Sequence, residues 1–316
     1  MPRGTATGKY VSRKVSKVRW CSADRHSKLG IPADAFVFGS YDDEFNQLGL
    51  CQLSSEQDEF RDSTVLNTIP HAGDVTDIKF PKEDHFVASS SCGDIGFYEI
   101  SNGQSPSMKE VFKWKKLHYF KNVNSAASCT AVDSLEDVLL SVGDDGRLNV
   151  VNLREFSDKP LQVIDTHFPA ATCLARHPTQ SHILISGDES GVVTVWDLRD
   201  TSIPTCVLNS HTTAVTEAQF HPLNTDHLFT CSAGGDLWQW DCSFPKVTNP
   251  FDTSLIPRGT VTWLALAESK HRPMLTSLMA KLPVSINTLD VSSNIVICGG
   301  DDEAIYTCTD VDVAPK

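Results

Sequence analysis

A repeating pair of short apolar strands, with a period of roughly 40–45 residues, constrains the fold of this chain more than any other feature. In each copy, an apolar run ends in small residues and a turn, and a second apolar run follows within a few positions. The first runs occupy residues 36–43, 87–94, 139–146, 184–191, 228–235 and 296–303. The second runs occupy residues 48–53, 95–100, 148–153, 193–198, 237–242 and 304–309. Turn signals of the Asp-Gly, Ser-Gly and Gly-Gly types between the runs predict tight hairpins, because such turns need a positive φ.

The spacing of matching residues indicates one common structural unit. Gly146, Gly191 and Asp236 lie at successive intervals of 45 residues, and the Trp-Asp pairs at 196–197 and 240–241 lie 44 residues apart. A repeat of this length, with four strands and a Trp-Asp signature, is typical of the blade of a β-propeller. One blade alone cannot bury both of its faces, whereas stacked neighbours can. The sequence therefore predicts an all-β WD-repeat β-propeller with six recognisable blades.

The two ends of the chain predict how the last blade is completed. That blade shows three strands, and the last of them ends near Asp310. The extended run at 10–15 has no other assignment, so we expect it to supply the missing outer strand and to close the ring, which also removes an exposed sheet edge. The expected organisation is a disordered N-terminus at 1–8, a single propeller domain at 9–310 and a C-terminal tail at 311–316.

Two segments depart from the period. Residues 101–125 form a polar stretch around one apolar run, which predicts an outer strand with decorated connections. Residues 243–285 exceed a normal connection by about 20 residues, and their apolar spacing suits either a short helix or an extra strand. An insertion on one face of a repeat protein is often where partners bind, and a plain surface loop is the equally open alternative.

The blades retain only parts of a known hydrogen-bond signature. Many WD blades contain a buried chain that links a His, a Ser or Thr, an Asp and a Trp. The signature residues recognisable here are Trp196, Asp197, Trp240, Asp241, Asp145, Gly146 and Asp302. Two blades keep the Trp but have Ser190 or Gly234 in place of Asp, and two keep the Asp but have Val151 or Cys308 in place of Trp. No blade shows the whole set.

The His residues of these blades have a structural interpretation. His71 and His211 stand where a WD blade opens. We interpret them, and the other signature residues, as parts of the blade framework rather than as metal ligands or catalytic bases.

The charge of the chain is acidic overall and basic at its start. The formal net charge is −13, which disfavours general binding to nucleic acid or to anionic membranes. Residues 1–20 contain six Lys and Arg residues and no acid. A basic strand lying on an acidic body is the favoured interpretation, and a separate nucleic-acid arm is the alternative.

The cysteines and the apolar runs point to a reducing compartment. None of the ten cysteines forms a C-x-x-C pair, which argues against zinc and thioredoxin-type sites. Cys92, Cys231 and Cys298 end apolar runs beside small residues, where a thiol acts as a small hydrophobe. Neither a signal peptide nor an apolar run of 18 residues is found, so we expect a soluble protein of the cytosol or nucleus, without membrane insertion.

Sequence motifs for catalysis are missing. The segment GTATGK at 4–9 lacks P-loop spacing, and neither G-x-S-x-G nor H-E-x-x-H occurs. Paired acids such as Asp144-Asp145 fall in turns, where Asp is favoured by hydrogen bonding to its own backbone. We therefore expect a protein-binding platform that is not an enzyme and that uses no cofactor or metal.

Four segments resemble one particular family of WD-repeat proteins. They are KYVSRKVSKVRW (9–20), HAGDVTDIKF (71–80), HPLNTDHLFTCSAGGDLWQWD (221–241) and SINTLDVSSNIVICGGDDEAIY (285–306). With them, the chain from about residue 9 to 308 resembles the family of small WD-repeat nucleoporins of forty-three kilodaltons. The two terminal stretches are the distinctive part of the likeness, because the middle repeats would fit many propellers.

This resemblance implies a structural role in the nucleus. The family belongs to the Y-shaped scaffold complex in the outer rings of the nuclear pore complex at the nuclear envelope. The resemblance implies a monomeric propeller inside a hetero-oligomer, docked on an α-solenoid nucleoporin, with no direct contact to nucleic acid. It also implies support of protein transport and messenger RNA export, and an association with kinetochores in cell division.

One departure from the family concerns the number of blades. The family is expected to have seven, whereas six are recognisable here, and only about 20 residues separate the runs at 148–153 and 173–178. Either this version closes with six blades, or it is a splice form or gene model that lacks an exon-sized piece.

Two other functions fit a WD propeller. The tetrapeptide Trp196-Asp197-Leu198-Arg199 matches the W-D-x-R pattern of substrate receptors of cullin-type ubiquitin ligases. Such receptors usually add a helical segment before the propeller, whereas residues 1–20 have the pattern of strands. A reader of histone tails or phosphopeptides is the third option. The sequence does not indicate which face binds a partner.

Overall fold

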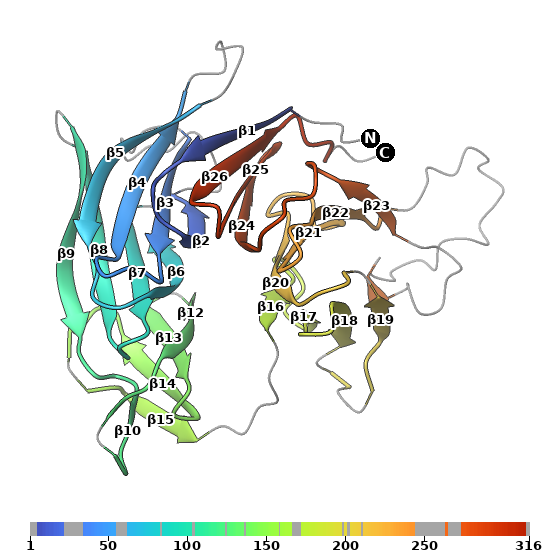
Figure 1. Cartoon of the computed structure of the whole chain (residues 1–316). Helices are drawn as coiled ribbons and strands as arrows, with labels where there is room; N and C mark the ends of the chain where they lie inside the picture. The colour runs from blue at the N-terminus through green and yellow to red at the C-terminus, as the bar shows by residue number, and fades with distance from the viewer. Residues whose placement is uncertain are drawn as a thin grey trace. The chain divides into compact units, whose positions relative to one another are not determined.

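The structure is a computed structural model in which the described residues form strands, turns and bends (Figure 1). These residues are 5–21, 34–54, 62–82, 84–102, 105–123, 125–135, 137–157, 159–165, 172–197, 199–200, 203–209, 211–243, 263–264 and 273–313. Within them, the strands build six four-stranded sheets, the six blades predicted from the repeat, and one short hairpin. The chain divides into two compact units, one of residues 7–169 with 299–306 and one of residues 1–6 with 170–298 and 307–316.

The unit of residues 7–169 contains three complete blades, each an antiparallel sheet in chain order. The first blade comprises β2 (Val15–Trp20), β3 (Ala35–Ser40), β4 (Gln47–Leu53) and β5 (Ser63–Pro70). The second comprises β6 (Val75–Lys82), β7 (His85–Ser90), β8 (Ile95–Asn102) and β9 (Pro106–Trp114). The third comprises β12 (Cys129–Leu135), β13 (Val138–Gly143), β14 (Arg147–Asn152) and β15 (Gln162–Asp165), and the hairpin of β10 (Tyr119–Phe120) and β11 (Ser125–Ala126) precedes it.

The other unit contains two complete blades. One comprises β16 (Cys173–Arg176), β17 (Ile183–Gly187), β18 (Val192–Asp197) and β19 (Cys206–Asn209). The next comprises β20 (Val215–Phe220), β21 (His227–Ser232), β22 (Leu237–Asp241) and β23 (Met274–Ser277). The segment at 243–285 thus contains β23, which is the regular outer strand of this blade and not an additional one. Residues 244–262 and 265–272 of the predicted insertion lie outside the described residues. The expected outer strand within 101–125 is likewise found, as β9.

The last blade combines the C-terminal strands with the start of the chain. Its order is β1 (Thr5–Tyr10), β26 (Ala304–Thr309), β25 (Ile295–Gly300) and β24 (Ile286–Ser292). An N-terminal strand therefore completes this blade, as predicted. However, the strand is Thr5–Tyr10 and not 10–15, and it begins inside the 1–8 segment that was expected to be disordered. Pairing with β26 extends to the Val11 amide, which donates to the Glu303 carbonyl over 2.8 Å, and a turn then leads to Val15, where β2 begins.

The basic start of the chain contacts acidic loops, as the charge pattern predicts. Lys9 lies 3.1 Å from Asp62. Arg13 lies 2.6 Å from Asp43, and Lys14 lies 2.6 Å from Asp42. These pairs are at least partly exposed, so each contributes at most about 1 kcal/mol. The backbone pairing of β1 is the larger contribution to the order of this blade.

Deletion of residues 1–10 should therefore loosen β26. We expect the backbone amides of Ala304–Thr309 to exchange with deuterium roughly tenfold faster or more, because the outer edge of β26 loses its partner. The amides of β21, in another blade, serve as the internal control and should keep their exchange rate. Unchanged exchange in β26 would show that β1 does not pair with it.

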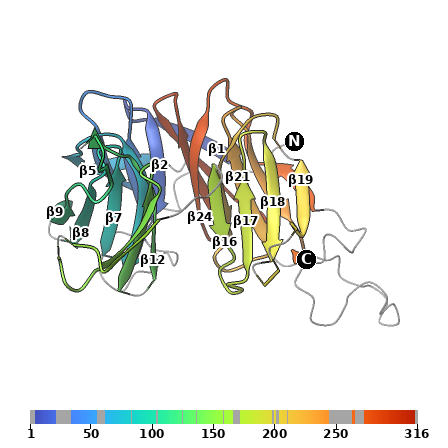
Figure 2. The ribbon, with the colours of Figure 1, turned by 90° about the horizontal axis from the view of Figure 1, so that it is seen from below.

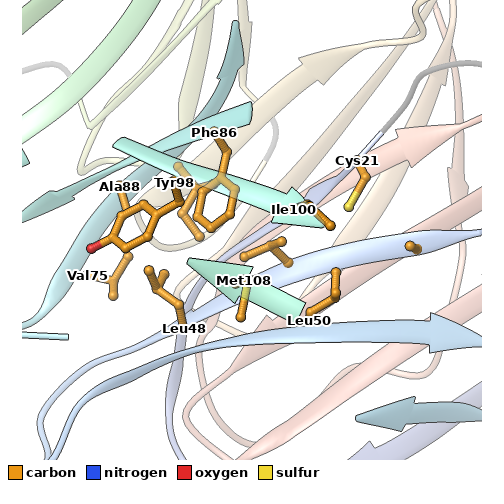
Figure 3. Packing of buried hydrophobic residues seen from close by; sticks show 12 residues of the cluster. Cys21, Leu48, Leu50, Val75, Phe86, Ala88, Tyr98, Ile100 and Met108 are labelled. Carbon is orange, nitrogen blue, oxygen red and sulfur yellow. The ribbon is translucent and has the colours of Figure 1, made fainter. Parts of the chain in front are cut away.

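Alternating apolar residues build the core between neighbouring blades. In the unit of residues 7–169, Leu48 and Leu50 of the first blade pack against Phe86, Tyr98 and Met108 of the second (Figure 3). The rings of Phe86 and Tyr98 stack with their centroids 4.9 Å apart. All of these side chains are buried, so the junction between the two blades is a continuous apolar core.

The predicted hairpin turns occur with one shift of position. Gly146 and Gly191 have φ values of 70° and 86°, as the turn signals require. In the next blade, the equivalent residue is Gly235, with a φ of 83°, and not Asp236. A side chain at position 235 would lie 2.1 Å from the Leu282 carbonyl oxygen, so only glycine fits there.

Candidate protein-binding surface and its supporting residues

The blade β12–β15 contains a buried hydrogen-bond chain centred on His118. The His118 ring contacts the Ser141 hydroxyl through Nε2 over 2.9 Å and the Asp145 carboxylate through Nδ1 over 2.8 Å. Asp145 also accepts a hydrogen bond from the Tyr119 amide. Asp145, one of the residues that we assign to the signature, therefore takes part in this chain, and Val151 is buried. His118 was missed, because we placed it in an outer strand, whereas it lies in the turn that follows β9.

A related chain in the blade β20–β23 contains the Trp and lacks the Asp. Thr230 contacts the His211 Nε2 atom and accepts a hydrogen bond from the Trp240 indole, each over 2.9 Å. Gly234 stands at the position of Asp145, and the His211 Nδ1 atom is buried without a hydrogen-bond partner. Each of these two blades therefore keeps three members of the signature.

The missing carboxylate makes the blade β20–β23 sensitive to acid. Burial lowers the pKa of His211 to about 4, whereas an unfolded histidine titrates near 6.5. Folding thus favours the neutral form of His211, and this contribution to the free energy of unfolding is fully present above pH 6.5. As the pH falls from about 6.5 through about 4, we expect a loss on the order of 3 kcal/mol in the free energy of unfolding, measurable by urea titration across this window.

The substitution Gly234→Asp provides the control for this prediction. An aspartate at this position would give His211 Nδ1 the acceptor that His118 has in its own blade. The new Cβ atom meets the Thr213 hydroxyl at 2.7 Å, and this hydroxyl has no hydrogen-bond partner and can rotate away. The variant should raise the pKa of His211 and flatten the acid branch of the stability curve. An identical acid branch in both proteins would mean that His211 does not cause the loss.

In the blade β16–β19, the signature residues lie closer to solvent. The Trp196 indole donates to the Ser186 hydroxyl over 2.9 Å, and the ring is only half-buried. The Arg199 guanidinium binds Asp197 through several hydrogen bonds, and this lowers the pKa of Asp197 to about 2. The Arg199 side chain is 64% exposed, so Arg199 lies at the surface shortly after the end of β18 at Asp197.

The remaining signature residues have local roles. Asp241 accepts a hydrogen bond from the Ser243 amide over 2.9 Å. Asp302 accepts one from the Tyr306 hydroxyl over 2.5 Å. Cys308, in place of Trp, is fully buried, and burial raises the pKa of its thiol to about 12. Cys231 and Cys298 are buried as expected, whereas Cys92 is exposed because it lies in a surface turn after β7.

A repeated set of polar contacts joins the first strands of neighbouring blades. In the unit of residues 7–169, the Thr76 hydroxyl donates to the Cys129 carbonyl over 2.5 Å. In the other unit, the Thr172 hydroxyl donates to the Val215 carbonyl over 2.5 Å. The Thr216 hydroxyl donates to the Ile286 carbonyl over the same distance. One residue further on, the Asp77 carboxylate accepts the Val132 amide over 3.0 Å. The Glu217 carboxylate accepts the Leu289 amide over 3.1 Å in the same way. These contacts hold the blades within each unit and provide a rigid base for surface side chains.

An aromatic cluster lies where the second and third blades meet. It consists of Phe97, Phe112, Trp114 and Phe156, and we name it the aromatic platform. Phe156 lies 5.3 Å from Phe97 and 5.2 Å from Phe112, between ring centroids. The buried Trp114 indole donates to the Ser157 carbonyl over 2.9 Å and so fixes the loop after β14.

The aromatic platform is the best candidate for a protein-binding surface. Phe156 is 42% exposed and packs on the buried rings of Phe97 and Trp114 and on the partly buried ring of Phe112. Val111, on the neighbouring β9, is 41% exposed. A rigid aromatic side chain held at the surface loses little conformational entropy on binding, and such residues dominate the energetics of protein interfaces.

Comparisons with known proteins support both the WD repeat and the resemblance to a nucleoporin. The WD domain, G-beta repeat family matches residues 158–197, a span from before β15 to the end of β18. The chain is a WD-repeat β-propeller. Nucleoporin Nup43 of Homo sapiens is 33% identical to this propeller over 153 residues, which is 45% of the chain and 39% of the human protein. Nucleoporin Nup43 of Mus musculus is 32% identical over 153 residues, with the same coverage.

The similarity to Nup43 covers part of each protein. The matched part spans about two fifths of the length of these curated relatives. The chain is therefore similar to a WD-repeat nucleoporin, in agreement with the resemblance found from its own segments.

The described residues offer neither a cluster of metal ligands nor a membrane-spanning helix. None of the His, Cys, Asp and Glu residues described there form a group of three or more that could hold a metal ion. A helix long and apolar enough to span a membrane is not found among those residues either.

Proposed function

We propose that this propeller is a structural scaffold subunit of the nuclear pore that binds other nucleoporins and catalyses no reaction. The observation that carries the proposal is the 33% identity to human Nup43 over 153 residues. The rigid junctions between blades and the partly exposed aromatic platform support it, because a scaffold subunit needs a fixed surface for protein contacts. The net charge of −13 also suits binding to proteins better than binding to nucleic acid.

The finer assignment follows the resemblance of the whole chain. We propose that the propeller belongs to the Y-shaped complex of the outer rings and docks on an α-solenoid nucleoporin at the nuclear envelope. In this position it supports protein transport and messenger RNA export, and it accompanies the complex to kinetochores in mitosis. The signature residues Trp196, Asp197, Trp240, Asp241, Asp145, Gly146 and Asp302 serve the framework in this proposal.

We assign the contact with the neighbouring nucleoporin to the aromatic platform. Phe156 is the exposed member of this cluster, and the buried Trp114 holds its loop in place. An apolar ridge of an α-solenoid helix offers side chains that would cover Phe156. Such a contact buries apolar surface that is already ordered, which favours affinity.

Affinity purification of the tagged full chain from its own cells tests this function. Co-purification of nucleoporins of the Y complex is the expected result. Recovery of a cullin adaptor without nucleoporins would contradict it and would favour the ubiquitin-ligase receptor that the W-D-x-R segment suggested.

A matched pair of variants tests the assigned surface. Phe156→Asp should reduce nucleoporin recovery roughly tenfold or more, because it places a charge in the centre of the contact. Phe45→Asp is the control, since Phe45 is 69% exposed in a different loop and belongs to no aromatic cluster described here. Equal recovery with both variants would exclude the aromatic platform as the contact and leave the scaffold function intact.

A further inference from the structure

The connection between the second and third blades of the unit of residues 7–169 is longer than comparable connections. Residues 115–128 link β9 to β12, whereas only residues 71–74 link β5 to β6 and only residues 210–214 link β19 to β20. The extra length contains the short hairpin of β10 and β11. An insertion in one repeat of a repeat protein is often where a partner binds. We call the described residues of 115–126 the basic hairpin.

The backbone of the basic hairpin is fixed by contacts with the blades on both sides of it. The Lys116 amide donates to the Asp94 carboxylate of the second blade over 2.8 Å. The Tyr119 amide donates to the Asp145 carboxylate of the third blade over 3.1 Å, and the Arg147 guanidinium lies 5.4 Å from the centre of the Tyr119 ring. Because the hairpin is already ordered, a partner that binds its exposed side chains does not have to order its backbone.

Three lysines of the basic hairpin have no ion pair among the residues that the structure describes. Lys115, Lys116 and Lys121 are all exposed, and no carboxylate in the described part of the chain pairs with their ammonium groups. The nearby Asp94 carboxylate lies 3.9 Å from Lys113 instead. The charges of these three lysines are therefore available to a partner.

The basic stretch at the start of the chain behaves differently. Arg13 lies 2.6 Å from Asp43, and Lys14 lies 2.6 Å from Asp42, so acids of the same unit neutralise both. Residues 106–126 contain five Lys and one Glu, a net charge of +4 in a chain whose formal net charge is −13. The basic hairpin thus keeps a local positive charge on an acidic protein.

Protection of a sheet edge does not explain these lysines. Lysines on an outer strand discourage pairing with other chains, and β7, β8 and β9 follow one another in Figure 2 with β9 outermost. However, the outer strands β5, β15, β19 and β23 contain neither Lys nor Arg. The three unpaired lysines also lie beyond the end of β9 at Trp114.

Two apolar side chains are exposed at the tip of the basic hairpin. The tip is a turn in which the Val123 amide donates to the Phe120 carbonyl over 3.3 Å. Phe120 is 39% exposed and Val123 is 71% exposed. The exposed Lys121 lies between them in the sequence, so positive charge and apolar surface occur together in one turn.

We propose that the basic hairpin binds an acidic segment of a partner protein that also carries apolar side chains. The carboxylates of the segment pair with Lys115, Lys116 and Lys121, and its apolar side chains cover Phe120 and Val123. A nucleic acid suits this surface less well, because it offers no aliphatic side chains and the chain as a whole is acidic. The surface shares no side chain with the aromatic platform, so the proposal does not depend on the nucleoporin function.

Fluorescence anisotropy with the purified full chain and labelled synthetic probes tests the proposal. The main probe is a short peptide in which Asp and Glu alternate with Leu and Phe. We expect a Kd of roughly 100 μM or tighter at low salt, and a clear loss of affinity at about 0.3 M salt, because salt screens exposed charges. Two further probes of the same length are a peptide with Ser in place of Leu and Phe, and a single-stranded RNA.

Variants of the chain separate the two parts of the surface. The triple substitution Lys115→Glu, Lys116→Glu and Lys121→Glu should weaken the main probe roughly tenfold or more, because it replaces attraction by repulsion. Val123→Ser should weaken it about threefold through the loss of apolar contact. Lys82→Glu is the control, since Lys82 is exposed at the opposite end of β6–β9, and it should leave the affinity unchanged. Thermal melts followed by circular dichroism verify that each variant is folded.

The outcomes divide clearly. Weaker binding by the folded triple variant, with a normal Lys82→Glu control, supports the assigned surface. The proposal is overturned if the native chain does not bind the main probe at low salt, or if the triple variant binds as tightly as the native chain. Equal affinity for the Ser-containing peptide, or tighter binding of the RNA, would also overturn it, because the partner would then have a different chemistry.

Discussion

Replacing Trp240 by alanine is expected to lower the free energy of unfolding by about 4 kcal/mol, as for other buried aromatic side chains. The Trp240 ring is 5% exposed and packs in the apolar junction between β16–β19 and β20–β23. Its removal leaves a cavity in this junction, and the Thr230 hydroxyl loses the indole N–H that donates to it. Chemical denaturation followed by circular dichroism measures the change.

Two further variants isolate the cause of the Trp240 effect. Trp240→Phe keeps most of the ring volume and loses the indole donor, so it should cost about 1–2 kcal/mol. Leu223→Ala, at an exposed position, should change the stability by less than about 0.5 kcal/mol. If Trp240→Ala were as mild as Leu223→Ala, Trp240 would not belong to a packed blade junction.

Replacing Asp77 by alanine is expected to cost about 3 kcal/mol, because the buried Val132 amide loses its acceptor and the largely buried Arg19 guanidinium loses its carboxylate partner. The Asp77 carboxylate accepts the Val132 amide of the next blade over 3.0 Å and lies 3.3 Å from the Arg19 guanidinium of the preceding one. The side chains of Arg19 and Asp77 are only 13% and 12% exposed. The same unfolding experiment reports the loss.

A nearby exposed pair provides the matched control for Asp77. Lys79 and Asp133 lie 3.0 Å apart, and their side chains are 44% and 45% exposed. Lys79→Ala should therefore cost at most about 1 kcal/mol. Equal effects of the two substitutions would show that Asp77 does not link the blades through buried contacts.

Local features of the fold could be predicted well from the sequence. The hairpin before β14 is an example, because an Asp-Gly pair between two apolar runs needs only a positive φ at Gly146. The six repeats and the outer strand β9 follow from the same period of apolar residues and turns. Their boundaries in the structure shift by a few residues, since strand ends depend on the partner strand.

Features that depend on distant partners were harder to predict. His118 acquires its role from Ser141 and Asp145, and no pattern around His118 itself reveals those contacts. The signal that could have found it is the Ser and Asp spacing within the blade that follows. The N-terminal strand was placed five residues too late, because residues 5–10 and 10–15 alternate in similar ways and only the pairing with β26 decides between them.

The location of the full chain in living cells tests the central claim most directly. A fluorescently tagged chain should mark the nuclear rim at pore sites in interphase, and its signal should recover slowly after photobleaching, as expected of a scaffold subunit. A diffuse signal without enrichment at the nuclear rim, with rapid recovery, would contradict the account.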